Sequence, residues 1–132
     1  MSLTLLFVGA AAGGGGAPAE CPEGTNACNT CDPKISDTLY ITVAGLPDPY
    51  ASSGFNATHT VAYDAGCEWK ADVGGGPHFI KLWWNATHWD IYCWDGIMDQ
   101  AIFIGDAGHD CAPWDATYTS TTAGTASVAC TE

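Results

Sequence analysis

The sequence predicts an all-β protein: a disulfide-stapled antiparallel β-sandwich of seven or eight short strands behind an extended N-terminal arm. Short runs of alternating apolar and polar residues recur about every 8–12 residues. Gly, Pro and Asn residues separate these runs, and no stretch keeps a helical period. Seven cysteines in 132 residues can form the expected disulfide bonds.

Three segments follow one another along the chain. Residues 1–19 form an apolar, Gly-rich arm, residues 20–36 a cysteine-rich loop, and residues 37–132 the sandwich. In the arm, Leu3, Leu5 and Phe7 would share one face of an extended strand.

The arm has some features of a signal peptide, including small residues spaced as at a cleavage site. However, no basic side chain precedes Lys34, and the apolar run is too short to span a bilayer. We therefore interpret residues 1–19 as an assembly arm that lies on another protein surface.

The sandwich is expected to begin with a strand over residues 38–44, in which Leu39, Ile41 and Val43 share one face. A Pro-rich loop over 45–54 follows. Two further strands, over 58–64 and 67–73, are joined by a tight turn at Ala65-Gly66. Their inward side chains are expected to be His59, Val61, Tyr63, Cys67, Trp69, Ala71 and Val73.

Residues 78–84 and 88–94 predict a hairpin across the second copy of a near-repeat, Asn-Ala-Thr-His, whose first copy is at 56–59. Adjacent Trp83 and Trp84 must point to opposite faces. At least one large aromatic side chain therefore lies outside, with Phe79, Tyr92 or Trp94. Strands over 101–104, 117–121 and 125–130 complete the domain. The hairpin's inward set is expected to be Ile80, Leu82, Trp84, Trp89, Ile91 and Cys93.

The cysteines indicate disulfides formed outside the reducing cytosol. An odd number leaves one thiol free, buried or paired between chains; the seven are Cys21, Cys28, Cys31, Cys67, Cys93, Cys111 and Cys130. The Cys28-x-x-Cys31 pair is only half of a zinc ligand set, so we favour disulfides. If the last strand pairs antiparallel beside the first, Cys130 ends near Cys28 or Cys31.

Charge excludes two classes of partner. Fifteen acidic residues face three lysines and no arginine, for a net charge of −12. Phosphate backbones and anionic lipids would be repelled, so neither nucleic acid nor membrane is an expected partner.

The loop over 106–115 is the best candidate cation site, with Asp106, His109 and Asp110. It lacks the alternating acidic pattern of a calcium loop, so we favour an acidic loop pinned by Cys111. We expect His59 and His88 each to bond its own turn rather than to form a metal pair. No cofactor is expected.

No catalytic motif stands out: there is no Gly-x-Ser-x-Gly elbow and no reason to select a carboxylate pair. We therefore expect no enzyme. Asn56 and Asn85 fit the glycosylation pattern, but we favour turn chemistry for both. Exposed Trp83 and Trp94 could stack on a surface glycan, or bury against a neighbouring subunit.

Several segments together resemble a known group of proteins. They are Cys28-x-x-Cys-Asp-Pro33, Asp37-Thr-Leu-Tyr-Ile-Thr-Val-Ala-Gly45, Phe55-Asn-Ala-Thr-His-Thr60, Gly66-Cys-Glu-Trp69 and the final Ala-Ser-Val run. This layout, over residues 28–130, resembles small cysteine-rich sandwich proteins encoded among bacteriophage structural genes and in some environmental bacteria. The resemblance implies a virion-surface or appendage protein without catalytic residues; the Gly-rich arm departs from it.

The leading expectation is a structural protein on a virus particle, a capsid decoration or cement protein whose arm ties it to other protein subunits. Two alternatives remain: an extracellular glycan-binding module that uses Trp83 and Trp94, and a filament subunit that donates its N-terminal strand.

Overall fold

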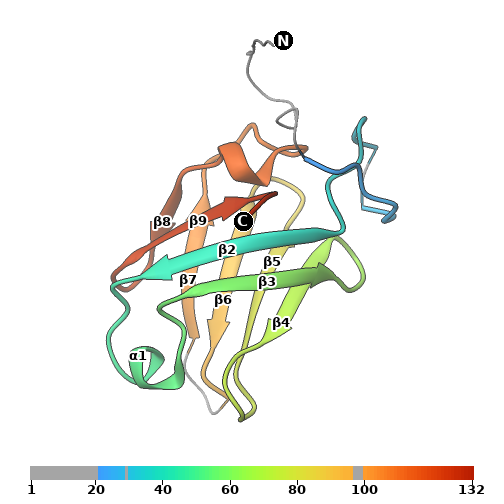
Figure 1. The fold of residues 1–132 in the computed structure, drawn as a ribbon. Helices are drawn as coiled ribbons and strands as arrows, with labels where there is room; N and C mark the ends of the chain where they lie inside the picture. The colour runs from blue at the N-terminus through green and yellow to red at the C-terminus, as the bar shows by residue number, and fades with distance from the viewer. Residues whose placement is uncertain (1–20, 29, 97–99) are drawn as a thin grey trace, which may run out of the picture.

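The computed structural model describes residues 21–28, 30–96 and 100–132 (Figure 1). These ranges contain eight strands in one antiparallel sheet, in the order β8-β7-β6-β5-β4-β3-β2-β9. In chain order the strands are β2 (Thr38–Ala44), β3 (Thr58–Tyr63), β4 (Glu68–Asp72), β5 (Phe79–Trp84), β6 (Trp89–Trp94), β7 (Gln100–Gly105), β8 (Tyr118–Ser120) and β9 (Thr125–Ala129).

The sheet curls into a nearly closed, barrel-like form. The all-β antiparallel prediction is therefore confirmed, but the two-layered sandwich is wrong. Strands β2 and β3 cross in front of β5, β6 and β7 in Figure 1, and the edge strands β8 and β9 contact each other. From β2 to β8, each strand pairs with the next one along the chain. This continuous ladder leaves no break at which a second sheet could separate.

Alternating burial confirms the predicted faces of the strands. In β2, Leu39, Ile41 and Val43 are buried between exposed or partly exposed neighbours. The hairpin of β5 and β6 follows the same pattern with two exceptions: Trp84 is only partly buried, and Asp90 is buried at an outward position. The largest fully buried side chains of the core are Trp69, Trp89, Phe55, Phe103, Ile35, Leu39, Ile41, Ile80, Leu82, Ile91, Val43 and Val61.

Two tryptophans lie at the centre of this core. The rings of Trp69 and Trp89 meet edge to face with centroids 5.8 Å apart. Each indole N–H has a backbone acceptor, which removes the cost of burying a polar group: Trp69 donates to the Ser36 carbonyl at 3.0 Å and Trp89 to the His109 carbonyl at 2.7 Å.

Short helices interrupt two of the expected loops. The Pro-rich loop contains α1 (Tyr50–Ser53), which ends at Gly54 in the left-handed conformation that glycine adopts without strain. The acidic loop contains the 3-10 turn η2 (Pro113–Asp115). None of the helices in the described ranges is long and apolar enough to cross a bilayer.

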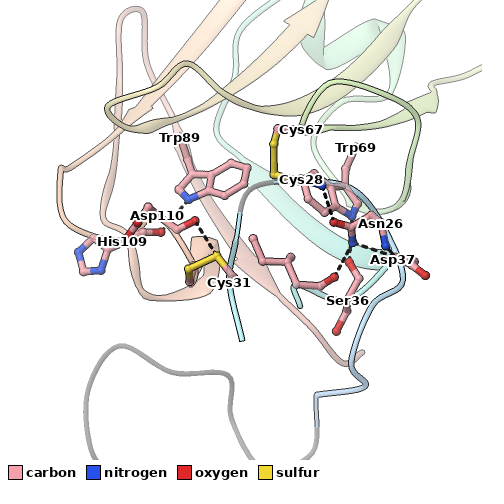
Figure 2. Close-up of a disulfide and its surroundings, with 12 residues drawn as sticks. Asn26, Cys28, Cys31, Ser36, Asp37, Cys67, Trp69, Trp89, His109 and Asp110 are labelled. Carbon is pink, nitrogen blue, oxygen red and sulfur yellow. Dashed lines mark hydrogen bonds between the residues drawn. A yellow bond between two sulfur atoms is a disulfide. The ribbon is translucent and has the colours of Figure 1, made fainter. Parts of the chain in front are cut away.

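The cysteine-rich segment packs onto the sheet as part of the same core. Three disulfides hold it: Cys21–Cys130, Cys28–Cys67 and Cys31–Cys111. Figure 2 shows Cys28–Cys67 beside the buried rings of Trp69 and Trp89. All three bridges join this segment to a strand end or a loop, which confirms the prediction of disulfides.

The predicted neighbour of Cys130 is corrected. The last strand does pair antiparallel beside β2, with Val128 opposite Ile41, yet Cys130 joins Cys21 rather than Cys28 or Cys31. The segment folds back on itself, because Gly24 N–H donates to the Lys34 carbonyl at 3.1 Å. This fold-back places Cys21, and not its two neighbours, beside the end of β9.

Hydrogen bonds to Asp37 stabilise this folded-back segment. The Asp37 carboxylate accepts hydrogen bonds from the backbone N–H groups of Thr25 and Asn26 and from both of their side chains, at 2.8–3.1 Å. Gly24 is required for the close approach, since a Cβ there would collide with the Ile35 carbonyl oxygen. The segment therefore meets the barrel through a fixed, hydrogen-bonded turn.

Candidate functional site

Four aromatic side chains lie together on the outside of the β5–β6 hairpin. Phe79 and Trp83 on β5, and Tyr92 and Trp94 on β6, point away from the core and are each partly exposed. We call these four residues the outer aromatic face. The sequence analysis singled out Trp83 and Trp94 and left the exact outer set open; the structure places all four on one surface.

Strand register sets the order of these rings. Phe79 pairs with Trp94 and Lys81 with Tyr92, while Trp83 pairs with Asp90. The rings of Phe79 and Trp94 are stacked, with centroids 6.3 Å apart and 28° between planes. Trp83 and Tyr92 meet at 6.1 Å and 57°. The hairpin therefore carries an aromatic pair at one end, a charged middle row, and Trp83 at the other end.

Two of the three lysines of the chain lie on this surface. Lys81 Nζ is 5.8 Å from the ring centroid of Trp83 and 5.2 Å from that of Tyr92. It also pairs with Glu68 on β4 at 3.0 Å. Lys70 Nζ is 4.4 Å above the ring of Phe79. Cation–π contacts thus bind the charges to the rings.

The sequence analysis did not combine these lysines with the outward aromatic side chains. The signal was present, because Phe79, Lys81 and Trp83 alternate on β5 just as Asp90, Tyr92 and Trp94 alternate on β6. Reading the outward positions of both strands as one set would have predicted the mixture of rings and charges.

A polar cluster closes the hairpin. The Asn85 side-chain amide donates to Asp90 Oδ2 at 3.0 Å and lies 2.8 Å from His88 Nε2. Thr87 Oγ1 contacts His88 Nδ1 at 2.9 Å, and His88 Nε2 lies 3.1 Å from Asp90 Oδ1. Asp90 is 5% exposed although it stands at an outward position. The sequence analysis did not single out this buried carboxylate.

The order Thr87–His88–Asp90 looks like a catalytic triad, but the backbone opposes that interpretation. A triad needs nearby N–H donors for a developing oxyanion. The N–H groups of Thr87 and His88 both donate to Asn85 Oδ1, at 3.1 and 3.0 Å. We therefore assign these contacts to the turn itself.

The histidines of the near-repeat behave as predicted, each bonding within its own turn. His59 Nε2 lies 2.8 Å from the Phe55 carbonyl oxygen, and His88 contacts Thr87 and Asn85. The two sequon asparagines differ: Asn85 bonds its own turn, whereas Asn56 bonds the preceding loop. Asn56 exchanges two hydrogen bonds with the backbone of Leu46, at 2.9 and 3.0 Å.

The acidic loop is held by local hydrogen bonds and by the Cys31–Cys111 bridge. Asp106 Oδ1 accepts the Thr117 N–H at 2.8 Å and lies 3.3 Å from His109 Nε2. The Thr117 hydrogen bond and the nearby His109 outweigh burial and lower the pKa of Asp106. The Asp110 carbonyl oxygen lies 3.7 Å from Cys31 Sγ, beside the Cys31–Cys111 bridge. Within the described ranges, no three metal-binding side chains come together.

Beyond Asp90, a shallow groove continues the surface along β7 and β8. Ile104 is the partner of Asp90 in the sheet and is 41% exposed. The groove has a volume of about 590 Å³ and is lined by Ile104, Gly105, Asp106, Thr117, Thr119, Ser120 and Thr121. Threonine methyl and hydroxyl groups give it a mixed polar character.

The predicted arm residues Leu3, Leu5 and Phe7 lie outside the described residues. Cys21, the first residue that the structure describes, is bonded to Cys130 directly after β9. The chain matches no protein-family model, no curated protein sequence and no solved structure.

Proposed function

We propose that this chain is a non-enzymatic structural protein of a virus-particle surface, a capsid decoration or cement protein held by its N-terminal segment. One observation carries the proposal. The Cys21–Cys130 bridge ties the point where residues 1–20 join the domain to the end of β9. In the sheet order, β5 is the fourth strand from β9 in either direction around the nearly closed barrel.

The point of attachment beside β9 and the outer aromatic face on β5 and β6 would therefore lie on opposite sides of the domain. A domain anchored beside β9 keeps the outer aromatic face on β5 and β6 turned toward the medium. Three disulfides suit such a position, since they persist in oxidising surroundings outside the cell.

The non-enzymatic part of the proposal rests on the His88 cluster. Its order of residues resembles a catalytic triad. However, the N–H groups of Thr87 and His88, which an acyl-transfer site would need, already donate to Asn85 within the turn.

The test compares the sedimentation mass of the full chain with that of residues 20–132, both kept oxidised. The shortened chain retains Cys21 and therefore its bridge. We expect the full chain to form defined oligomers, and residues 20–132 to be monomeric with an unchanged melting temperature. A full-length variant with Leu3, Leu5 and Phe7 all changed to Ser should also be monomeric.

Two outcomes would count against the proposal. If the full chain is a monomer, the arm does not assemble it. If it forms long fibres that residues 20–132 cannot form, the filament alternative replaces the virion-surface role, because an open-ended contact generates filaments rather than closed oligomers.

A further inference from the structure

We propose that the outer aromatic face is a carbohydrate-binding platform, and that its ligand is a neutral oligosaccharide lying along the β5–β6 hairpin. The inference rests on the proposed function only in that the face must be turned outward, away from β9.

The first argument is the mixture of groups on the face. Sugar-sized ligands bind where apolar or aromatic surface is combined with a few fixed polar groups. Here the partly exposed rings of Trp83, Tyr92 and Trp94 share one outer surface with the Lys81–Glu68 pair. Rings can stack on the C–H faces of a sugar, while the ammonium and carboxylate groups bond its hydroxyls.

The same mixture disfavours a protein partner. The centres of protein interfaces are depleted in Lys, Glu and Asp, because burying a charged pair costs its hydration. Lys81 and Glu68 are each 22% exposed; Lys81 stands in the middle row of this surface and Glu68 beside Trp83. A hydroxyl-rich ligand would keep both groups hydrogen-bonded, whereas an apolar protein surface would not.

Charge selects a neutral ligand. Lys70 and Lys81 are balanced on the same outward side of β4 and β5 by Glu68 and Asp72, so the face itself has little net charge. The whole chain carries −12, which repels polyanionic glycans at a distance.

The ring positions give the direction and length of the site. Trp94 lies opposite Phe79 at one end of the hairpin, and Trp83 lies at the other end. From Phe79 to Trp83 the strand advances about 13 Å, at the usual rise of ~3.3 Å per residue. A single sugar ring cannot contact both tryptophans, so a chain of several units is required.

Trp94 is the main stacking ring. Among the described lysines, Lys70 covers Phe79 and Lys81 lies over both Trp83 and Tyr92, but none lies over Trp94. Phe79 stacks on one side of the Trp94 ring, and a sugar can stack on the other side without displacing a cation, whereas stacking on Trp83 competes with Lys81.

The test applies the oxidised full chain to a microarray of neutral and anionic glycans of increasing length. We expect binding to neutral glycans that strengthens with chain length, and none to anionic ones. Trp94→Ala should weaken the association constant about tenfold, and Trp83→Ala severalfold. Tyr40→Ala is the matched control, because Tyr40 is a partly exposed aromatic on the outer side of β2; it should bind like the unchanged chain.

Folding is checked in the same samples by melting temperature, and Trp94→Leu provides a second variant that keeps an apolar side chain. Absence of binding to every neutral glycan, or an equal loss in Tyr40→Ala, would overturn the inference. So would loss of self-assembly in Trp94→Ala, since the face would then be a protein contact. A monomeric full chain that still binds glycans would overturn only the proposed function.

Discussion

His88 Nε2 lies 3.1 Å from Asp90 Oδ1, and the side chain of Asp90 is 7% exposed. This oxygen is fully buried and has no regular hydrogen bond. A carboxylate oxygen and an unprotonated imidazole nitrogen both present lone pairs, so a stable contact at this distance needs one proton between them. The end of the β5–β6 hairpin therefore holds a buried carboxyl group in contact with a partly exposed imidazole, and Asp90 pairs with Trp83 in the sheet.

Asp90 makes stability depend on pH. Burial raises the pKa of Asp90, although His88 and the Asn85 hydrogen bond partly oppose it. The folded chain then binds this proton more tightly than the unfolded chain. The ordinary pKa of an aspartate is 3.8. The contribution of Asp90 to the free energy of unfolding falls as pH rises from that value through the raised pKa of Asp90.

Asp90→Asn should remove this dependence. The amide keeps the shape of the side chain and can donate to His88 while accepting from Asn85. We expect the melting temperature at pH 7 to rise by about 4 °C, which corresponds to ~1 kcal/mol in a domain of this size. Exposed Asp72→Asn should change little. A fall of several degrees in Asp90→Asn would mean that the carboxylate stabilises the turn as an ion pair.

Asp37 should give stability a pH dependence of the opposite sign to that of Asp90. Partial burial raises the pKa of the Asp37 carboxyl, but the hydrogen bonds from Asn26 and Thr25 together lower it below 3.8. The stabilisation by Asp37 is complete above pH 3.8 and is lost as pH falls through the lowered pKa of Asp37. We expect Asp37→Asn to cost about 1 kcal/mol at pH 7 in urea unfolding, and less in acid. Asp64→Asn is the exposed control; equal losses at pH 7 and pH 3 would contradict the account.

Cys93 should be the single free thiol. It is fully buried on β6, and burial raises its pKa to about 12. The thiolate is the reactive form, so a thiol reagent should label no cysteine in the native chain and one after denaturation without reductant. Peptide mapping should then find the label on Cys93. Labelling of the native chain would contradict the burial of Cys93, and labelling of a second cysteine would contradict the three bridges.

Alanine substitutions of the adjacent Trp83 and Trp84 should differ sharply in their effect on the stability of the fold. Trp84 packs against the core, with its ring centroid 5.2 Å from that of Trp89, so Trp84→Ala should cost about 3 kcal/mol. Trp83 loses only contacts on the outer surface, so Trp83→Ala should cost about 1 kcal/mol or less. Urea unfolding measures both. Equal costs would mean that the outer aromatic face is structural, like the core.

The faces of the strands were predictable because side chains alternate with a period of two, and the hairpin turns carry Asn at defined places. Closure of the sheet was not predictable, because a sandwich and a barrel bury the same face of every strand. The partner of Cys130 depended on the Gly24–Lys34 fold-back, which no periodicity signals. Asp90 stands at an outward position, and only the neighbouring turn reveals that it is buried.

The most direct test of the account is the set of indole N–H signals in an NMR titration of the oxidised full chain with a neutral oligosaccharide from the array. Of the six tryptophans, Trp83 and Trp94 should shift on binding, while Trp69 and Trp89, whose indoles donate inside the core, should not. Shifts confined to Trp114, or absent from Trp83 and Trp94 at saturating ligand, would show that the outer aromatic face is not the binding surface.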